Sequence, residues 1–172
     1  MNVRTRRALI ALVALLSVAS GATGLALKSS VGAANAAARA SAPPRDLAAD
    51  ERLGGHTLQR HVGKTDAELA ERLRREAHVS AASTYVDLAT ASRVVGVTLA
   101  RSSRRLDGWL AREGSRPNLV LNYTQGIGAA IGRSLRRGER SSRPCDRAVV
   151  VVRWDDRRGR WYVLTSYPEA RQ

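Results

Sequence analysis

The sequence predicts an α+β fold in which N-terminal helices pack on a C-terminal antiparallel sheet. Three observations support this class. Apolar residues recur at helical spacing in the first half, two β-rich runs follow near the C-terminus ("RAVVVVRW" and "RWYVLTSY"), and only the turn-forming stretch "DDRRG" separates those two runs. The order of the elements, helices first and a hairpin last, is the one expected for an α+β domain.

The composition limits the core and points to an anionic partner. The chain has 172 residues, of which 44% are hydrophobic and only 4% aromatic, so Ala, Val and Leu must build the core of about one domain. Lys and Arg number 29 against 15 Asp and Glu, and the formal net charge is +14. Such a charge suits nucleic acid, an anionic membrane surface or an acidic protein partner, and it does not define a fold.

The first 36 residues predict a signal peptide. A basic start, "MNVRTRR", precedes the apolar run "ALIALVALLSVAS", and "ANA" at residues 34–36 offers a cleavage site. The alternative is an uncleaved anchor, because the uncharged run 8–27 is just long enough to span a bilayer. Small and polar residues in its second half favour cleavage. We therefore expect a secreted protein, or one held on the outer face of the cytoplasmic membrane if the segment is retained.

A linker and a single cysteine complete the organisation of the chain. Residues 37–52 are rich in Ala and contain a Pro pair, which predicts a flexible linker and a folded domain over residues 53–172. Cys145 is the only cysteine, so no intramolecular disulfide can form. It is either a buried thiol or a link between chains, and the domain must be stabilised by packing.

Three helices are expected in order. Thr65 and Glu68 fit a capping box, so the first helix begins after Thr65. A second helix is expected from about Thr84 to Arg101 and a third around Trp109, where Gly114 can end it. The apolar stripes of the three are Leu69, Leu73 and Ala77; Leu88, Ala91, Val95 and Leu99; and Leu106, Trp109 and Leu110.

The second half of the chain predicts strands. "NLVLNY" over residues 118–123 is typical of a strand, and the two β-rich runs after residue 146 predict a hairpin. Between them, "GIGAAIGRSLRRG" over residues 126–138 is ambiguous between a short helix and an irregular loop.

The stretch "GGHTLQRHVGKTDAELAERL", residues 54–73, concentrates unusual chemistry. It holds two of the three histidines, His56 and His61, and one of the two lysines, Lys64. "GKT" is not a P-loop, because Leu58 stands where that motif needs a glycine, and the two histidines lack the i, i+4 spacing of a zinc helix. No acidic or cysteine cluster accompanies them, so we expect neither a metal nor a cofactor. The remaining chemistry is a histidine acting as general base or acid beside cations that hold a phosphate, against the alternative of loop histidines with local hydrogen bonds.

Both ends of the domain resemble one family. The stretch from Gly54 to Leu73 is similar to the entry segment of the bacterial RNase A-like toxin domain, found at the C-termini of contact-dependent growth-inhibition effectors, and "WYVLTSYPE" resembles its last strand. "ASTYVDLATA" and "LDGWL" match more loosely, and the likeness spans about Leu53 to Glu169. It implies an RNase A-like architecture without disulfides, RNA as substrate, with tRNA as one candidate, and a dedicated, often acidic, immunity protein as partner.

The resemblance also implies an active site. Carried over onto this sequence, its histidine is His61, its arginine is Arg72, and its Thr-x-Tyr pair is Thr165 and Tyr167. Thr165 and Tyr167 are two apart on an expected strand and so face the same side, although Thr and Tyr favour strands in any case. From the sequence alone, the neighbouring arginines of the helix are as good as Arg72.

These residues predict metal-independent cleavage of RNA, in which His61 takes the proton of a 2′-hydroxyl and the other three stabilise the charged phosphate. The proton for the leaving oxygen could come from His56, Lys64 or Tyr167. The alternatives are a non-catalytic basic protein that binds nucleic acid or an anionic surface, and, less favoured, a DNase. A DNase usually needs a metal because DNA lacks the internal nucleophile. Trp109, Trp154 and Trp161 are candidates for base stacking, with core packing favoured for Trp109.

Overall fold

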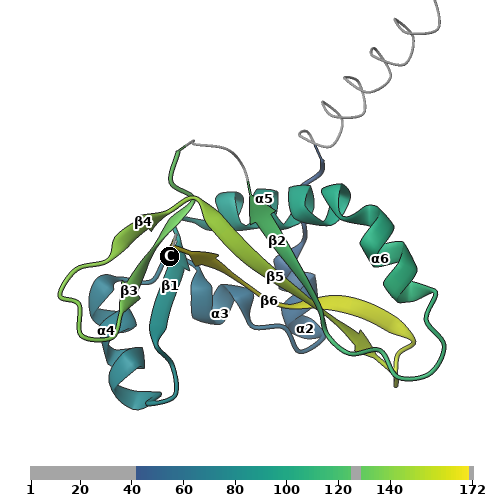
Figure 1. Ribbon diagram of the computed structural model, residues 1–172, viewed down its shortest axis with the longest axis horizontal. Helices are drawn as coiled ribbons and strands as arrows, with labels where there is room; N and C mark the ends of the chain where they lie inside the picture. The colour runs from purple at the N-terminus through teal and green to yellow at the C-terminus, as the bar shows by residue number, and fades with distance from the viewer. Residues whose placement is uncertain (1–41, 125–128, 171–172) are drawn as a thin grey trace, which may run out of the picture. The chain divides into compact units, whose positions relative to one another are not determined.

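The computed structural model describes residues 42–124 and 129–170 (Figure 1). The chain divides into two units, Met1–Ala37 and Ala38–Gln172, and every described residue belongs to the second. The predicted signal peptide or anchor lies outside the described residues. Within the described ranges, no helix is both long and apolar enough to cross a membrane.

The described residues form an α+β fold, as predicted. Two antiparallel three-stranded sheets have the strand orders β1-β3-β4 and β2-β5-β6. The helices are α2 Leu47–Arg52, α3 Thr57–His61, α4 Asp66–Arg75, α5 Leu88–Arg101 and α6 Ser103–Leu110. The strands are β1 Ala81–Tyr85, β2 Leu119–Thr124, β3 Gly132–Arg136, β4 Arg143–Cys145, β5 Arg147–Asp155 and β6 Arg160–Glu169. Cys145 is a buried free thiol.

Helix α2 corrects the predicted linker. Leu47 lies in the hydrophobic core. Asp50 is buried and forms a bidentate salt bridge with Arg45, whose Nε and Nη2 lie 2.9 and 2.7 Å from its carboxylate oxygens. The same carboxylate accepts a hydrogen bond from the backbone nitrogen of Val163 on β6, at 3.0 Å. The flexible linker predicted over residues 37–52 is therefore wrong for α2, which belongs to the folded domain. A six-residue helix with one large apolar residue, Leu47, is too weak a pattern to indicate this in advance.

Helices α4 and α5 begin where side chains cap them. The capping box at α4 is confirmed, because Thr65 Oγ1 accepts from Glu68 N at 3.2 Å and Thr65 N donates to Glu68 Oε2 at 2.7 Å. Helix α5 begins at Leu88 and not near Thr84, since Thr84 lies in β1 and Asp87 supplies the N-cap. Helix α6 is where the third helix was expected, and Gly114 follows it with a left-handed φ of 72°.

Strand β3 was missed. The stretch "GIGAAIGRSLRRG" was expected to be a helix or a loop, yet Gly132–Arg136 pairs with β1 along its full length. A Cβ on Gly132 would lie 2.3 Å from Thr84 O and 2.6 Å from Pro168 Cγ, so only glycine lets β1, β3 and β6 approach this closely. The predicted strand at β2 and the β5–β6 hairpin are confirmed.

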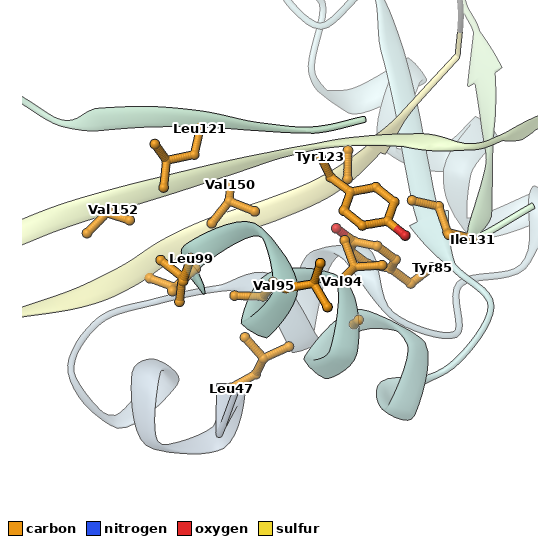
Figure 2. Close-up of a cluster of buried hydrophobic side chains, with 14 of the residues drawn as sticks. Leu47, Tyr85, Val94, Val95, Leu99, Leu121, Tyr123, Ile131, Val150 and Val152 are labelled. Atoms are coloured by element: carbon orange, nitrogen blue, oxygen red, sulfur yellow. The ribbon is translucent and has the colours of Figure 1, made fainter. Parts of the chain in front are cut away.

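Two hydrophobic clusters hold the helices on the sheets. Figure 2 shows Val94, Val95 and Leu99 of α5 packed between Leu47 and the inner faces of β2 and β5. Four buried residues form the second cluster, which fixes α4 on β1 and β3: Leu69, Leu73, Ala82 and Leu135.

The three tryptophans lie outside the site described below. Trp109 is buried in the core, and its Nε1 donates to Pro117 O at 2.7 Å, so core packing is its role. Trp154 and Trp161 pair across the β5–β6 hairpin, and each carries an arginine on its ring: Arg116 on Trp154 and Arg45 on Trp161.

Candidate active site

A cleft of about 780 Å³ opens between sheet β1-β3, helices α3 and α4, and the end of β6. Figure 1 shows β6 ending beside β1 and β3, where these strands contact one another. Five of the six residues singled out in the sequence line this cleft: His56, His61, Arg72, Thr165 and Tyr167. They come from segments more than ninety residues apart in the chain, so the fold brings together what the sequence separates.

His61 ends helix α3 with a defined tautomer. Its side chain is buried, at 6% exposure, and its Nδ1 lies 3.1 Å from the backbone oxygen of Ser83. Because a carbonyl oxygen only accepts, Nδ1 carries the hydrogen and Nε2 keeps its lone pair. Burial, opposed by the bond to Ser83 and reinforced by the charge of Arg72, lowers the pKa of His61 to about 3. The imidazole is therefore neutral near pH 7, which is the form a general base needs.

This burial predicts how stability depends on pH. The pKa of His61 is lower in the folded state (about 3) than in the unfolded chain (~6.5), so unfolding takes up a proton between those values. The contribution of the neutral imidazole to the free energy of unfolding is fully present above pH ~6.5. It is lost as the pH falls toward 3, with a limiting slope of about 1.4 kcal/mol per pH unit. Denaturant unfolding of wild type and His61→Gln from pH 7 to 4.5 measures it. We expect a shallower slope in the variant, and equal slopes would contradict the buried neutral imidazole.

Arg72 and Thr165 present polar atoms that have no partner within the described part of the chain. Arg72 Nε donates to Glu76 Oε2 at 3.3 Å, which holds the guanidinium in place, while its Nη1 is buried without a hydrogen bond. Thr165 Oγ1, on β6, is also buried without one. An unsatisfied buried polar atom is costly and uncommon. Both residues line the cleft, so a ligand that is rich in hydrogen-bond acceptors and reaches these atoms there would satisfy them.

Tyr167 completes this group of residues. It lies two residues after Thr165 on β6, so both side chains face the cleft as the period of a strand predicts. Its ring centroid lies 5.4 Å from that of His61. Burial, and then the negative charge of Glu169, raises the pKa of Tyr167, so its hydroxyl keeps its proton and can donate.

Lys64 is not in the cleft. Its Nζ lies 3.8 Å from Glu68 Oε1, and the residue borders a second cavity of about 730 Å³ between α3 and α4. The left-handed turn at Gly63, with φ 66°, separates it from His61. Lys64 therefore does not line the cleft of His61, but it shares the second cavity with Arg72, which lines both.

His56 is at the edge of the cleft, where the backbone tethers it. Its nitrogen donates to Leu164 O at 2.9 Å, and burial, followed by the charges of Arg60 and Arg72, lowers the pKa of its imidazole. Gly55 makes this tether possible, because a Cβ there would lie 2.6 Å from Val163 O.

Other polar residues of the cleft were missed in the sequence: His78, Ser80, Ser83, Ser134, Arg136 and Glu169. No motif marks them, and β3, which carries two of them, was not recognised as a strand. His78 follows α4 at an exposed position, where a lone histidine carries no pattern. Among the residues described, no three His, Cys, Asp or Glu side chains are grouped so as to hold a metal ion.

Two antiparallel sheets with helices and no disulfide, and a cleft where a histidine on a short helix faces a Thr-x-Tyr strand, define an RNase A-like domain. The family model described as the bacterial CdiA-CT RNAse A domain matches residues 55–168, and the chain belongs to this family. The resemblance seen at the two ends of the sequence is thereby confirmed.

A solved structure agrees with this assignment. One chain of the CdiA-CT/CdiI complex from Y. kristensenii 33638 is 28% identical to this chain, with a TM-score of 0.58. The match covers 67% of this chain and 99% of that chain. A comparison with curated proteins gives no match.

Proposed function

We propose that this protein is a secreted ribonuclease toxin that cleaves RNA without a metal ion. One observation carries the proposal. The free Nε2 of His61 shares a cleft with two buried atoms that lack partners among the described residues, Arg72 Nη1 and Thr165 Oγ1. A neutral base beside unsatisfied donors fits a phosphodiester with a neighbouring hydroxyl, which is the reacting group of RNA. Family membership supports the same conclusion.

In the proposed reaction, His61 Nε2 takes the proton of the 2′-hydroxyl. The 2′-oxygen then bonds to phosphorus, and the bond from phosphorus to the 5′-oxygen breaks. Negative charge grows on the phosphoryl oxygens, where Arg72 and Thr165 donate hydrogen bonds that are not made in the free protein. The products are a 2′,3′-cyclic phosphate end and a 5′-hydroxyl end, so atoms and charge balance without a further reactant.

We assign the proton for the leaving 5′-oxygen to Tyr167. Tyr167 lines the cleft with its ring beside that of His61, and its hydroxyl keeps its proton because its pKa is raised. His56 lines the same cleft, but its lowered pKa favours the neutral form, which has no acidic proton to give near pH 7. We do not assign this role to Lys64, because it lines the second cavity, which it shares with Arg72, and not the cleft of His61 and Tyr167.

A partner and a location follow from the same proposal. The similar chain from Y. kristensenii was solved as a CdiA-CT/CdiI complex. We infer that this chain likewise has a cognate immunity protein, and its net charge of +14 predicts an acidic binding surface on that partner. The basic, apolar N-terminus supports export, with retention on the outer face of the cytoplasmic membrane as the alternative if the segment is not cleaved.

Incubation of the purified protein with tRNA and with single-stranded DNA, in EDTA, tests the proposal. We expect RNA to be cut and DNA to be left intact, because only RNA carries the internal nucleophile. EDTA should not slow the reaction. Binding of RNA without any cleavage would instead support a non-catalytic basic binding protein, and cleavage of DNA that EDTA abolishes would support a metal-dependent nuclease.

A further inference from the structure

A buried group of hydroxyls joins the three elements that carry the cleft. Ser166 lies on β6 between Thr165 and Tyr167 and points to the opposite, buried side. Its Oγ donates to Val149 O at 2.9 Å and lies 2.6 Å from Tyr85 Oη. A serine hydroxyl has one proton, so Tyr85 donates to Ser166. This fixes the direction of every bond in the group.

The backbone of Ser166 extends the group to helix α3. Its nitrogen donates to Thr57 Oγ1 at 2.9 Å, and Thr57 is buried. Thr57 begins α3 and His61 ends it one turn later. The residue between the two cleft-facing side chains of β6 is thus bonded directly to the helix that presents the imidazole.

Tyr85 ties the same group to β1. It lies two residues after Ser83, whose carbonyl orients His61, and its own carbonyl accepts from Gly63 N at 3.3 Å, just after His61. The three hydroxyls therefore lie on three different elements of the site: Thr57 on α3, Tyr85 on β1 and Ser166 on β6.

We propose that Thr57, Tyr85 and Ser166 are positioning residues for the proposed ribonuclease reaction. They do not line the cleft and touch no substrate. They set the position of Thr165 and Tyr167 relative to His61. A buried hydrogen-bonded group favours one arrangement of its elements, because a shift breaks bonds that no water replaces. Transfer reactions are sensitive to such shifts, since a displacement of about 1 Å can cost roughly 100-fold in rate. The inference rests on the proposed function.

Paired substitutions separate positioning from simple stability. Thr57→Val keeps the shape but leaves Ser166 N without an acceptor, whereas Thr57→Ser keeps the acceptor. We expect Thr57→Val and Tyr85→Phe to lower kcat by roughly 10- to 100-fold with KM within about twofold of wild type. Thr57→Ser should retain most of kcat. Thr98→Val is the matched control: Thr98 is also buried, and its hydroxyl donates to Val94 O at 2.7 Å within α5, away from the cleft. It should lower Tm and leave kcat unchanged.

A second readout does not depend on RNA cleavage. The titration of His61, followed by NMR and assigned with His61→Gln, should move toward the ordinary histidine range in Tyr85→Phe, because a loosened α3 admits water to the ring. Thr98→Val should leave this titration at its wild-type position.

These readouts distinguish the possible failures. A wild type that cuts no RNA would refute the proposed function, while the titration still tests positioning. Tyr85→Phe removes one oxygen and no carbon, so it carries the test if Thr57→Val does not fold. If Tyr85→Phe lowers Tm as Thr98→Val does but leaves kcat and the His61 titration unchanged, the hydroxyls are structural and the inference is overturned.

Discussion

His61→Ala is expected to lower the rate of RNA cleavage by roughly two to four orders of magnitude, the cost of losing a general base. The imidazole is neutral because burial lowers its pKa to about 3, and its Nε2 is free because Nδ1 donates to Ser83. RNA binding should persist, because the phosphate backbone is attracted by many cations and not by this neutral ring. Single-turnover cleavage of a labelled RNA, with binding measured on a 2′-O-methyl analogue, separates the two effects.

His56→Ala is the matched control for that experiment. Both histidines line the cleft and lie on the same short segment, but the backbone of His56 is tethered to β6 and its side chain has no assigned proton to move. We expect a loss of less than about tenfold. If His61→Ala retains full activity with an intact fold, the assignment of the base is wrong. If His56→Ala removes the alkaline limb of the pH–rate curve, His56 and not Tyr167 is the acid.

Arg72→Ala is expected to lower kcat by roughly 100- to 1,000-fold, the range seen when one preorganised donor to a developing oxyanion is removed. The side chain is only 18% exposed, is held by Glu76 and has a buried Nη1 without a partner among the described residues. Arg72→Lys should recover only part of the rate, since an ammonium keeps the charge but not the forked geometry. Steady-state kinetics on a defined oligonucleotide measures each variant.

The same helix provides the control for Arg72. Arg75 is 72% exposed at its side chain and pairs with Glu71 on the solvent side of α4. Arg75→Ala should therefore change kcat little while removing the same formal charge. An equal loss in Arg72→Ala and Arg75→Ala would show that net charge, and not a placed donor, accounts for the effect.

The local signals in the sequence predicted local structure well. The capping box at Thr65 and the β5–β6 hairpin depend on neighbouring residues, and both form as expected. Helix α3 and strand β3 could not be predicted in this way. Thr57 at the start of α3 bonds to β6 across more than a hundred residues, and Gly132 in β3 is required by a crossing of three strands.

The residues of the candidate site also differ in whether local sequence or the tertiary fold determines their position. The period of a strand placed Thr165 and Tyr167 on one side before the fold was known, because that relation is local. Nothing local distinguishes Arg72 from its neighbours in "ERLRRE", whereas in the fold its side chain is 18% exposed and those of Arg74 and Arg75 are 68% and 72% exposed. Lys64, three residues from His61, was expected to share its site, yet the left-handed turn at Gly63 lies between them.

Cleavage of a DNA oligonucleotide that contains a single ribonucleotide tests the central claim most directly. Four versions, one for each base, remove the dependence on an unknown base preference. The account predicts one cut, on the 3′ side of the ribonucleotide, in EDTA, with a 2′,3′-cyclic phosphate on one product and a 5′-hydroxyl on the other by mass spectrometry. The same oligonucleotide with a 2′-O-methyl group at that position should stay intact. Cleavage of the methylated version, or of the all-DNA control, would contradict attack by the 2′-hydroxyl and with it the role given to His61.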